Sequence, residues 1–562
     1  MAASWIDERS AAARGELSTT PVHFQNSESL ACGGVLLLVP FLLETGLLSF
    51  KNHYQELDSG YYYIDAIVLL LAFMYLCRVK NPEQLKTINP GDFGKLLGLD
   101  RVPEAKCLRK KLKQICQQHK STQWNMELAK EWSWAEENEF YYIDGHIQVY
   151  HGYKANLGKK HVSRQKLCLP GVQEFWINNA QGMPYFYVCG QVNEKLQQMI
   201  EEKIVPQLLG QMHTNKPVDS ETPVLTIVFD REAYSPAFFG QLWENHQVAV
   251  ITYRKNVKDQ WQVDDFSKTI VEIEGVETDM SLAEKSVELD GVRLREIRRL
   301  TKSGHQTSIL TTHVKLSIGQ VALYMFSRWS QENFFRYMRQ DYDFDKIAQY
   351  TTDQIDNEFV VVNPAHNKVD YQLKKTREKI ARRKAKLYVL IEENVNSDLD
   401  QTPKELRKQQ KIKEELVSLE QQEVQLINQR KETPHRIKVE DMGENRYNQL
   451  NLESKLFRNI IKMICYRAET SFATLLSSGY KKATTEKRAL AKNLIKTPVD
   501  IEVDPINKRL NVTLYSQTTP RYNNAVDKLC DVLNKSSTNF PGTDLCLYYK
   551  TTTKQFTKGQ EF

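Results

Sequence analysis

Val224-Leu-Thr-Ile-Val-Phe-Asp-Arg-Glu-Ala-Tyr234 is the stretch that decides the fold. Its apolar run from Val224 to Phe229 contains β-branched residues, follows Pro223, and predicts a short buried strand. Asp230 ends the run, and Ser235-Pro236 then signals a helix start, with serine as the cap and proline in the first turn. A carboxylate between a central strand and a helix is a common place for chemistry in an α/β sheet. The alternative is an acid that only begins a loop, so its meaning depends on partners elsewhere in the chain.

The neighbouring segments predict a sheet with helices packed on it. Extended runs are expected at 140–150, 166–178 and 183–190, helices at 192–209 and 236–245, and a further strand at 248–253. Short alternating runs predict a β-rich insertion over 257–313, and a single helix is expected near 314–340. The order of three strands, helix, strand, helix, strand indicates an α/β sheet with an antiparallel hairpin edge. It is also the element order of a ribonuclease H-like core.

The helix expected near 314–340 carries charge where an apolar face should continue. Ile318, Val321 and Met325 share one face at helical spacing. The next positions on that face are all charged: Arg328, Glu332, Arg336 and Arg339. The alternative is a run of surface salt bridges, but a solvated face is expected opposite the apolar stripe and not along it.

Three acids meet in this arrangement of elements. Asp144 falls on the first strand, Asp230 at the tip of the fourth, and Glu332 on the late helix. Adjacent carboxylates repel one another unless a cation binds them. Hard oxygen ligands suit Mg²⁺ or Mn²⁺, and two such ions support an in-line phosphoryl displacement. We therefore expect Asp144, Asp230 and Glu332 to be both catalytic residues and metal ligands, with two ions per site.

Two further side chains are expected to support this site. His146 lies two residues after Asp144 and should share its face of the strand, where it would position water or DNA. Glu232 would be an additional acid near the ions. The alternatives are an ordinary packed or surface histidine, and a salt bridge or helix-start charge for Glu232.

The chain resembles DDE transposases of the bacterial insertion-sequence, cut-and-paste type. The resemblance rests on YYIDGH around Asp144, FDREAYS around Asp230, and RWSQENFFRYMR around Glu332. The last piece matches in part the family signature Y-x2-R-x3-E-x6-K: Arg328 and Glu332 have the right spacing, and Arg339 takes the lysine position. The tyrosine position holds Met325, with Tyr324 beside it.

The resemblance implies a DNA transposase that binds terminal inverted repeats. The acid triad would cut one strand to free a 3′-hydroxyl, which then attacks a phosphodiester, and two protomers would pair the two DNA ends. Arg328, Arg336 and Arg339 would hold DNA phosphates. The partners expected are double-stranded DNA at the transposon ends and target, and a second copy of the chain.

A helix-turn-helix is expected near the N-terminus. Residues 90–113 predict a short helix, a turn at Gly98-Leu-Asp100 and a second helix starting at Pro103. That second helix carries Lys106, Arg109, Lys110, Lys111 and Lys113. Of these, Lys106, Arg109, Lys110 and Lys113 are expected to bind DNA. The alternative is a solvated basic face on an ordinary helix.

Two charged helices joined by a turn at 394–403 predict a helical hairpin or short coiled coil. The first, 371–390, is strongly basic, and the second spans 404–431. The hairpin would pair protomers or lie along DNA, or it is a solvated intramolecular hairpin. A helix near 452–476 and strands near 499–503, 510–515 and 545–549 indicate a small α+β unit after it, ending in a polar tail from Thr551.

The fold class expected is therefore multidomain, with an α/β ribonuclease H-like core. Its parts are a flexible N-terminal arm (1–30), a helical helix-turn-helix DNA-binding domain (31–125), the core (135–256 and 314–365), the β-rich insertion (257–313), the helical hairpin (366–440) and a C-terminal α+β domain (441–562). The length of 562 residues suits such a division.

Composition sets outer limits on the function. The balance of 76 basic and 70 acidic residues gives a charge of +6, which permits nucleic-acid binding without requiring it. Nine dispersed cysteines without a CxxC pair predict reduced thiols in a cytosolic setting. We see no signal peptide. The apolar stretches 33–50 and 61–79 are interrupted by charge and predict buried helices rather than membrane spans. We therefore expect a cytoplasmic protein, associated with the nucleoid if the host is bacterial.

The hypothesis from the sequence is a metal-dependent DNA transposase. One rival is a related metal-dependent nuclease that cleaves without joining strands. Another is a catalytically retired, transposase-derived DNA-binding protein.

Overall fold

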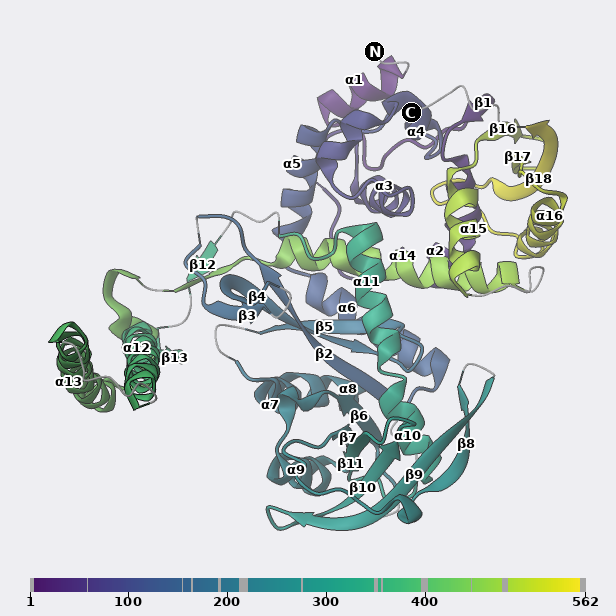
Figure 1. Ribbon diagram of the computed structural model, residues 1–562. Helices are drawn as coiled ribbons and strands as arrows, with labels where there is room; N and C mark the ends of the chain where they lie inside the picture. Colours follow the sequence, from purple (N-terminus) through teal and green to yellow (C-terminus); the bar gives the residue numbers. More distant parts are fainter. Residues whose placement is uncertain are drawn as a thin grey trace.

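The computed structural model describes residues 5–57, 59–153, 155–162, 165–190, 194–211, 221–273, 276–347, 352–354, 357–395, 403–445, 447–477 and 484–555. It has three parts, which we call the sheet lobe, the helical lobe and the hairpin arm (Figure 1). The sheet lobe lies at the bottom of the view, the helical lobe at the top with both ends of the chain, and the hairpin arm projects to one side.

The sheet lobe is built around strand β2 (Phe140–Val149). On one side β2 pairs with antiparallel β4 (Leu167–Asn178), which pairs in turn with antiparallel β5 (Pro184–Gly190) and β3 (Lys159–Val162). On the other side β2 pairs with parallel β6 (Leu225–Phe229), and β6 with parallel β7 (Val248–Tyr253). Asp144 and Asp230 thus lie on neighbouring strands of one mixed sheet.

Alternating side chains of the central strands cover the two faces of the sheet. Tyr142, Val228 and Ile251 pack against Val321 and Met325 of helix α10 (Ile318–Phe326). Their neighbours along the strands face the opposite side, which is covered by helices α7 (Leu196–Met199), α8 (Val205–Gln211) and α9 (Pro236–His246). A π-helical turn, Ile200–Ile204, joins α7 to α8. Burial on both faces explains why the central strands read as continuous apolar runs.

The segment 257–313 extends the same sheet. It forms β8 (Ser267–Ile273), β9 (Val276–Leu289), β10 (Val292–Leu300) and β11 (Gln306–Thr311), preceded by the short turn Val263–Asp265. β11 pairs antiparallel with β7, so the segment continues the sheet beyond the core strands. The inward faces of β8 and β9 pack on α10.

The helix expected over 314–340 is two helices. α10 (Ile318–Phe326) ends at Ser327, and α11 (Trp329–Tyr342) begins after Arg328. Serine hydroxyls supply the local reason: Ser327 donates to the carbonyl of Leu323 at 2.8 Å, and Ser330 to that of Ser327 at 2.8 Å. The expectation of one continuous helix is therefore wrong.

The helical lobe combines both ends of the chain. Its N-terminal elements are α1 (Ile6–Arg14), β1 (Ser27–Leu30), η1 (Gly33–Leu38), α2 (Val39–Glu44), η2 (Ser49–Asn52), α3 (Ile64–Leu76), η3 (Pro82–Thr87), α4 (Pro90–Lys95), α5 (Ala105–Cys116) and α6 (Ser121–Glu136). Its C-terminal elements are α14 (Glu453–Ser477), α15 (Thr484–Lys496), β16 (Val499–Asp504), β17 (Arg509–Ser516), α16 (Pro520–Lys535) and β18 (Cys546–Gln555). Helix α14 packs against α2, α3, α5 and α6, so the two ends share one core.

This shared core corrects three expectations from the sequence. The segment 5–30 is not a loose arm, because Trp5 is buried and β1 pairs antiparallel with β16. The N-terminal and C-terminal regions do not form separate domains. Residues 551–555 belong to β18 and are not a tail, while 556–562 lie outside the described residues.

The two apolar stretches near the N-terminus lie in this core. Helix α3 is buried along almost its whole length. Among the described residues, no helix is long and apolar enough to cross a bilayer.

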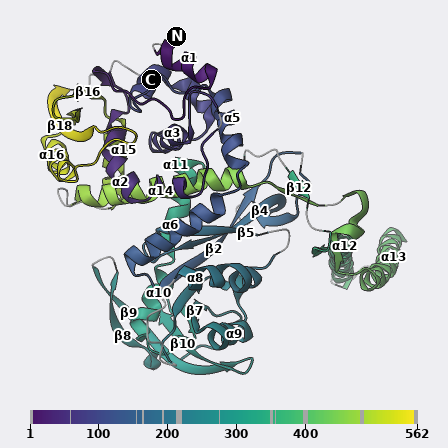
Figure 2. The ribbon, with the colours of Figure 1, turned by 180° about the vertical axis from the view of Figure 1, so that it is seen from behind.

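The hairpin arm consists of α12 (Pro364–Val395) and α13 (Pro403–Glu432). Their seam is apolar, with Val369 and Leu373 facing Leu426, and Ile380 facing Ile412 and Leu416. At its base β13 (Val360–Val362) pairs with β14 (Arg436–Lys438), followed by the turn Val439–Asn445, and β12 (Thr352–Gln354) pairs with β15 (Asn448–Leu450). Most of the predicted turn, residues 396–402, lies outside the described residues. Figure 2 shows the arm standing away from both lobes from behind as well.

Candidate active site

Arg328 brings the three predicted acids together. Its guanidinium lies 3.8 Å from Asp144 Oδ1, 3.7 Å from Asp230 Oδ2 and 3.2 Å from Glu332 Oε1. The arginine is nearly buried, with 11% of its side chain exposed. The side chains of Asp144, Asp230 and Glu332 are progressively more open to solvent, at 28%, 47% and 63%. Acids far apart in the chain therefore share one cation at the surface of the sheet.

Three elements position these side chains. Asp144 lies within β2, where it pairs with Trp176 of β4 and directly follows Ile143, the last β2 residue paired with β6. Asp230 follows the last residue of β6 and accepts a hydrogen bond from the backbone N–H of Arg231 at 2.7 Å. Arg328 immediately precedes α11, and Glu332 lies in its first turn. The break between α10 and α11 is what places Arg328 at a helix start.

The site carries more negative than positive charge. Burial raises the pKa of Asp144 to about 6; Arg328 opposes this shift, and Asp230, Glu232 and Glu332 add to it. Three carboxylates thus lie around one guanidinium, and the charge of Glu232 adds to theirs. The donor chemistry, oxygen ligands with excess negative charge, fits a divalent cation.

The distances between the acidic side chains do not match this donor chemistry. Within the described part of the chain, no three carboxylate, histidine or cysteine side chains are spaced to hold one metal ion. In this arrangement Arg328 supplies the positive charge among the acids. Binding of an ion would therefore require Arg328 or the exposed Glu332 to change rotamer.

Glu232 and His146 lie close to the triad in different ways. Glu232 accepts a hydrogen bond from Gln173 at 3.0 Å, and one of its oxygens lies beside Gly145, where a Cβ would meet it at 3.0 Å. His146 stacks on Phe335 and Phe344, with ring centroids 5.4 and 5.1 Å apart. Glu232 therefore lies beside Gly145, on the face of β2 opposite the Asp144 side chain, whereas His146 packs β2 onto α11.

The other predicted DNA contacts are dispersed. Arg336 is exposed and donates to Asn333 at 2.7 Å, and Arg339 donates to the carbonyl of Phe335 at 3.1 Å, so neither joins Arg328 among the acids in this arrangement.

Helix α5 lies on the helical lobe, away from the acids (Figure 1). Lys106, Lys110 and Lys113 of α5 are exposed, and Arg109 pairs with Glu83. Lys111, counted by the sequence with the basic face, is buried and donates to the carbonyl of Ser59 at 2.6 Å.

Two residues near the acids were not indicated by any sequence motif or spacing. Tyr253 ends β7 beside Asp230; burial raises its pKa, which Arg328 lowers and Asp230 raises. Lys160 of β3 lies near Glu232; burial lowers its pKa, and Glu232 opposes that shift. Strand pairing brings both residues to the acids, which spacing along the chain does not reveal.

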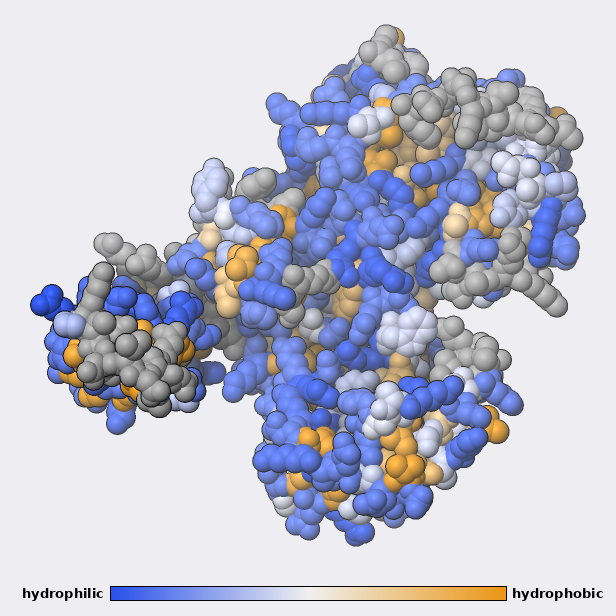
Figure 3. Space-filling view, viewed as in Figure 1, coloured by the Kyte–Doolittle hydropathy of each residue, from blue (hydrophilic) through white to orange (hydrophobic). Residues whose placement is uncertain are grey.

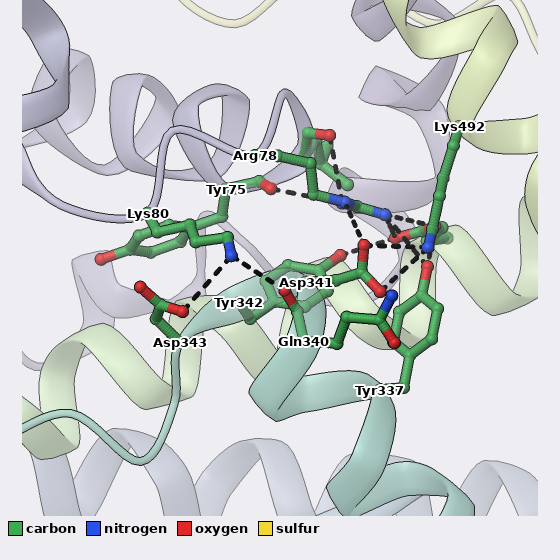
Figure 4. A network of polar contacts seen from close by, with 11 residues as sticks. Tyr75, Arg78, Lys80, Tyr337, Gln340, Asp341, Tyr342, Asp343 and Lys492 are labelled. Atoms are coloured by element: carbon green, nitrogen blue, oxygen red, sulfur yellow. Dashed lines mark hydrogen bonds and ion pairs between the residues drawn. The ribbon is translucent and has the colours of Figure 1, made fainter.

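The far end of α11 is held by the helical lobe (Figure 4). Arg78, which follows α3, donates to Glu469 of α14 at 2.8 and 3.0 Å and to Asp341 of α11 at 3.2 Å. Tyr342 also donates to Glu469, at 2.6 Å, and Lys492 of α15 donates to Asp341 at 2.9 Å. The helix that begins with Arg328 and Glu332 therefore ends in a buried polar network.

A cleft of about 1070 Å³ opens at the other end of the sheet. It lies between the start of β2, the β4–β5 turn and the C-terminal part of α14, and Glu137, Phe140, Tyr324 and Thr470 are among its lining residues. The triad acids are not part of its lining, so the acid site is separate from this cleft.

An acid group on a mixed sheet with one arginine at its centre is a site suited to phosphate chemistry. The sequence profile of a family described as transposase protein matches residues 2–553, nearly the whole chain. The chain belongs to this transposase family. No curated protein and no solved structure matches it.

Proposed function

We propose that this transposase uses the DDE mechanism, with Asp144, Asp230 and Glu332 as the triad. The observation that carries the proposal is that Arg328 lies within 4 Å of all three carboxylates. The acids come from β2, the end of β6 and the first turn of α11, three elements separated along the chain. Three carboxylates around one arginine leave an excess of negative charge, which divalent cations would neutralise while they stabilise the charge that develops on a phosphoryl group.

The order of the strands supports a ribonuclease H-like core. The sequence of strands across the sheet is β5, β4, β2, β6, β7, with β4 antiparallel to its neighbours and β2, β6 and β7 parallel. That fold has the same order and directions, with acids on the first and fourth core strands.

Mg²⁺ is the proposed cofactor, with Mn²⁺ as a substitute and two ions per site. Asp144, Asp230 and Glu332 would hold the ions, and the charge of Glu232, which acts on Asp144, would add to the attraction for them. Bound there, the ions would activate the attacking oxygen and stabilise the leaving oxygen. Arg328 would orient a DNA phosphate through its two-pronged guanidinium.

The proposed substrate is double-stranded DNA with terminal inverted repeats. The exposed Lys106, Lys110 and Lys113 of α5 form a positive face on the helical lobe that suits phosphate contacts. Two copies of the chain would pair the two DNA ends.

Cleavage and joining of DNA that carries the element's own ends tests this proposal. Wild-type protein with Mg²⁺ is expected to cut the ends and join them to target DNA. Asp230→Asn should bind the ends and do neither. Glu244→Gln is the matched control, because Glu244 is an exposed acid of the neighbouring α9 and no triad member. Full activity in Asp230→Asn would remove Asp230 from the mechanism, and cleavage without joining would identify a nuclease.

One observation favours a second candidate, a retired transposase that only binds DNA. Arg328 stands among the acids, and the described side chains form no ready metal group. A retired protein would bind the ends and show no Mg²⁺-dependent cut. Titration with Mn²⁺ separates the two readings: the active enzyme gains thermal stability that Asp230→Asn lacks, whereas the retired protein gains none.

A further inference from the structure

Eight of the nine basic residues of α12, all except the exposed Lys374, fall into two sets that differ in their partners. Three face α13 and form ion pairs: Arg377 with Glu423 at 2.7 Å, Arg383 with Glu415 at 2.7 Å, and Lys384 with Glu420 at 2.9 Å. This set stabilises the hairpin and has little charge left for another molecule. We call it the paired set.

The second set lies on another face of the same helix. Lys368, Lys375, Lys379, Arg382 and Lys386 fall within about 60° of one another at 100° per residue. All five are exposed. The ion pairs that the described residues make on this face are limited to Lys375 with Glu378, at 2.9 Å. We call these five residues the open stripe.

The open stripe has the length and position of a DNA contact. From Lys368 to Lys386 it extends about 27 Å, or about eight base pairs of duplex. Helix α12 lies between α13 and the main body in both views (Figures 1 and 2). The stripe lies about 130° around α12 from Ile380, which packs on α13, so α13 does not cover it. In Figure 3 the described surface of the arm is hydrophilic with apolar patches, and Tyr371 and Val389 are exposed on α12. The charge is therefore presented to a ligand rather than neutralised by α13.

We propose that the open stripe binds the phosphate backbone of duplex DNA. The hairpin arm is then a second DNA contact, separate from α5 and from the acid site. The inference rests on the proposed action on DNA. A second copy of the chain fits this face less well, because protein interfaces are depleted in lysine and the stripe has five cations in a row. Regularly spaced cations suit a regular row of phosphates.

The salt dependence of DNA binding tests the inference. The full-length protein is titrated with a mixed-sequence duplex of roughly 40 base pairs over a range of salt concentrations. In the first variant, Lys379, Arg382 and Lys386 of the open stripe are each changed to Gln. In the control, Arg377, Arg383 and Lys384 of the paired set are each changed to Gln. Both variants remove three positive charges from one helix, so long-range electrostatics change equally.

Only contact with phosphates distinguishes the two variants. The open-stripe variant should lower the slope of log K against log salt by about 2.7, because each phosphate contact contributes about 0.9. The paired-set variant should lower it by much less. Lys379→Arg with Lys386→Arg should keep the wild-type slope. Circular dichroism checks that the hairpin remains folded in each case.

Three results would overturn the inference. Equal changes in slope for both variants would mean that α12 acts only through its net charge. An unchanged slope in the open-stripe variant would remove the contact. Loss of self-association with an unchanged slope would identify a protein-binding face. In each of these cases wild-type binding and cutting remain, whereas failure of the proposed function appears as wild-type protein that neither binds nor cuts DNA.

Discussion

Replacing Arg78 with Met should destabilise the protein strongly and selectively loosen α11. The Arg78 guanidinium makes two bonds to Glu469 at 2.8 and 3.0 Å, and one each to Asp341 at 3.2 Å and Tyr337 at 3.0 Å. The carboxylate of Glu469 has no solvent exposure. Methionine fills most of the volume but leaves this buried carboxylate without its cation (Figure 4). Removal of one partner of a buried ion pair is expected to lower the free energy of unfolding by about 3–5 kcal/mol.

Two assays together check this value. Urea unfolding gives the loss of stability, and hydrogen exchange of the α11 amides gives its location. The double variant Arg78→Met with Glu469→Gln should lose less than the sum of the single variants, because a neutral amide needs no buried cation. Arg14→Met is the control: its pair with Glu16 is exposed on both sides, and its removal should change stability little.

The reasoning fails if Arg78→Met behaves like Arg14→Met. It also fails if stability falls but exchange in α11 is no faster than in α9, since the network would then not be what holds α11. If the stability losses of the two single variants add up to the loss of the double variant, Arg78 and Glu469 act independently.

Two further predictions concern packing and pH. Gly34→Ala should lower the free energy of unfolding, measured in urea, by about 3 kcal/mol or more, because its Cβ would lie 1.7 Å from the carbonyl oxygen of Leu494. The control is Gly210→Ala, which has open space around it and should leave stability unchanged or increase it. For His313, burial and then Arg295 lower the pKa to about 4 from 6.5. The unfolded chain therefore binds a proton that the folded chain does not, and stability should fall by about 2 kcal/mol, allowing for solvent screening, as pH drops from 6.5 to 4. His313→Asn should flatten thermal stability over that window, and an unchanged slope would contradict the assignment.

The strands of the core could be predicted from local pattern. Extended runs expected at 140–150 and 248–253 appear as β2 and β7, and the helix expected at 236–245 appears as α9. Each has a strong local signal: β-branched alternation for the strands, and Ser235-Pro236 for the helix, where the serine side chain accepts from the N–H of Phe238. Local chemistry specifies these elements, so local reasoning found them.

The acids of the candidate site could be predicted from the sequence, but the residues and the helix break around them could not. Helical spacing from Met325 led to Arg328 and Glu332, although the helix breaks between Phe326 and Trp329. At the break the Ser327 hydroxyl adds a second hydrogen bond to the carbonyl of Leu323, a local feature that a 3.6-residue period does not detect. Tyr253 reaches the site through strand pairing, which has no fixed spacing in sequence.

The division into domains failed for a different reason. Strand β1 pairs with β16 across more than 450 residues, and Arg78 binds Glu469. Neither contact has a local signature, since pairing and buried ion pairs depend on the assembled fold. The N-terminal segment was predicted to be loose because its sequence is polar, yet the buried side chain of Trp5 packs it onto the helical lobe.

Helix α11 belongs to both lobes, and this bears on how the helical lobe is coupled to the acid site. Its first turn carries Glu332 next to Arg328, and its last turn carries Asp341 and Tyr342 in the helical lobe. Fourteen residues separate these ends by about 21 Å, too short and too regular for independent motion. Gln331, in the same first turn as Glu332, donates to the carbonyls of Tyr142 and Trp176 at 3.2 and 3.1 Å, and Phe335 stacks on His146. The start of α11 is therefore tied to β2 and β4 and its end to the helical lobe, so this one helix holds the backbone of Glu332 beside Asp144 and joins the two lobes.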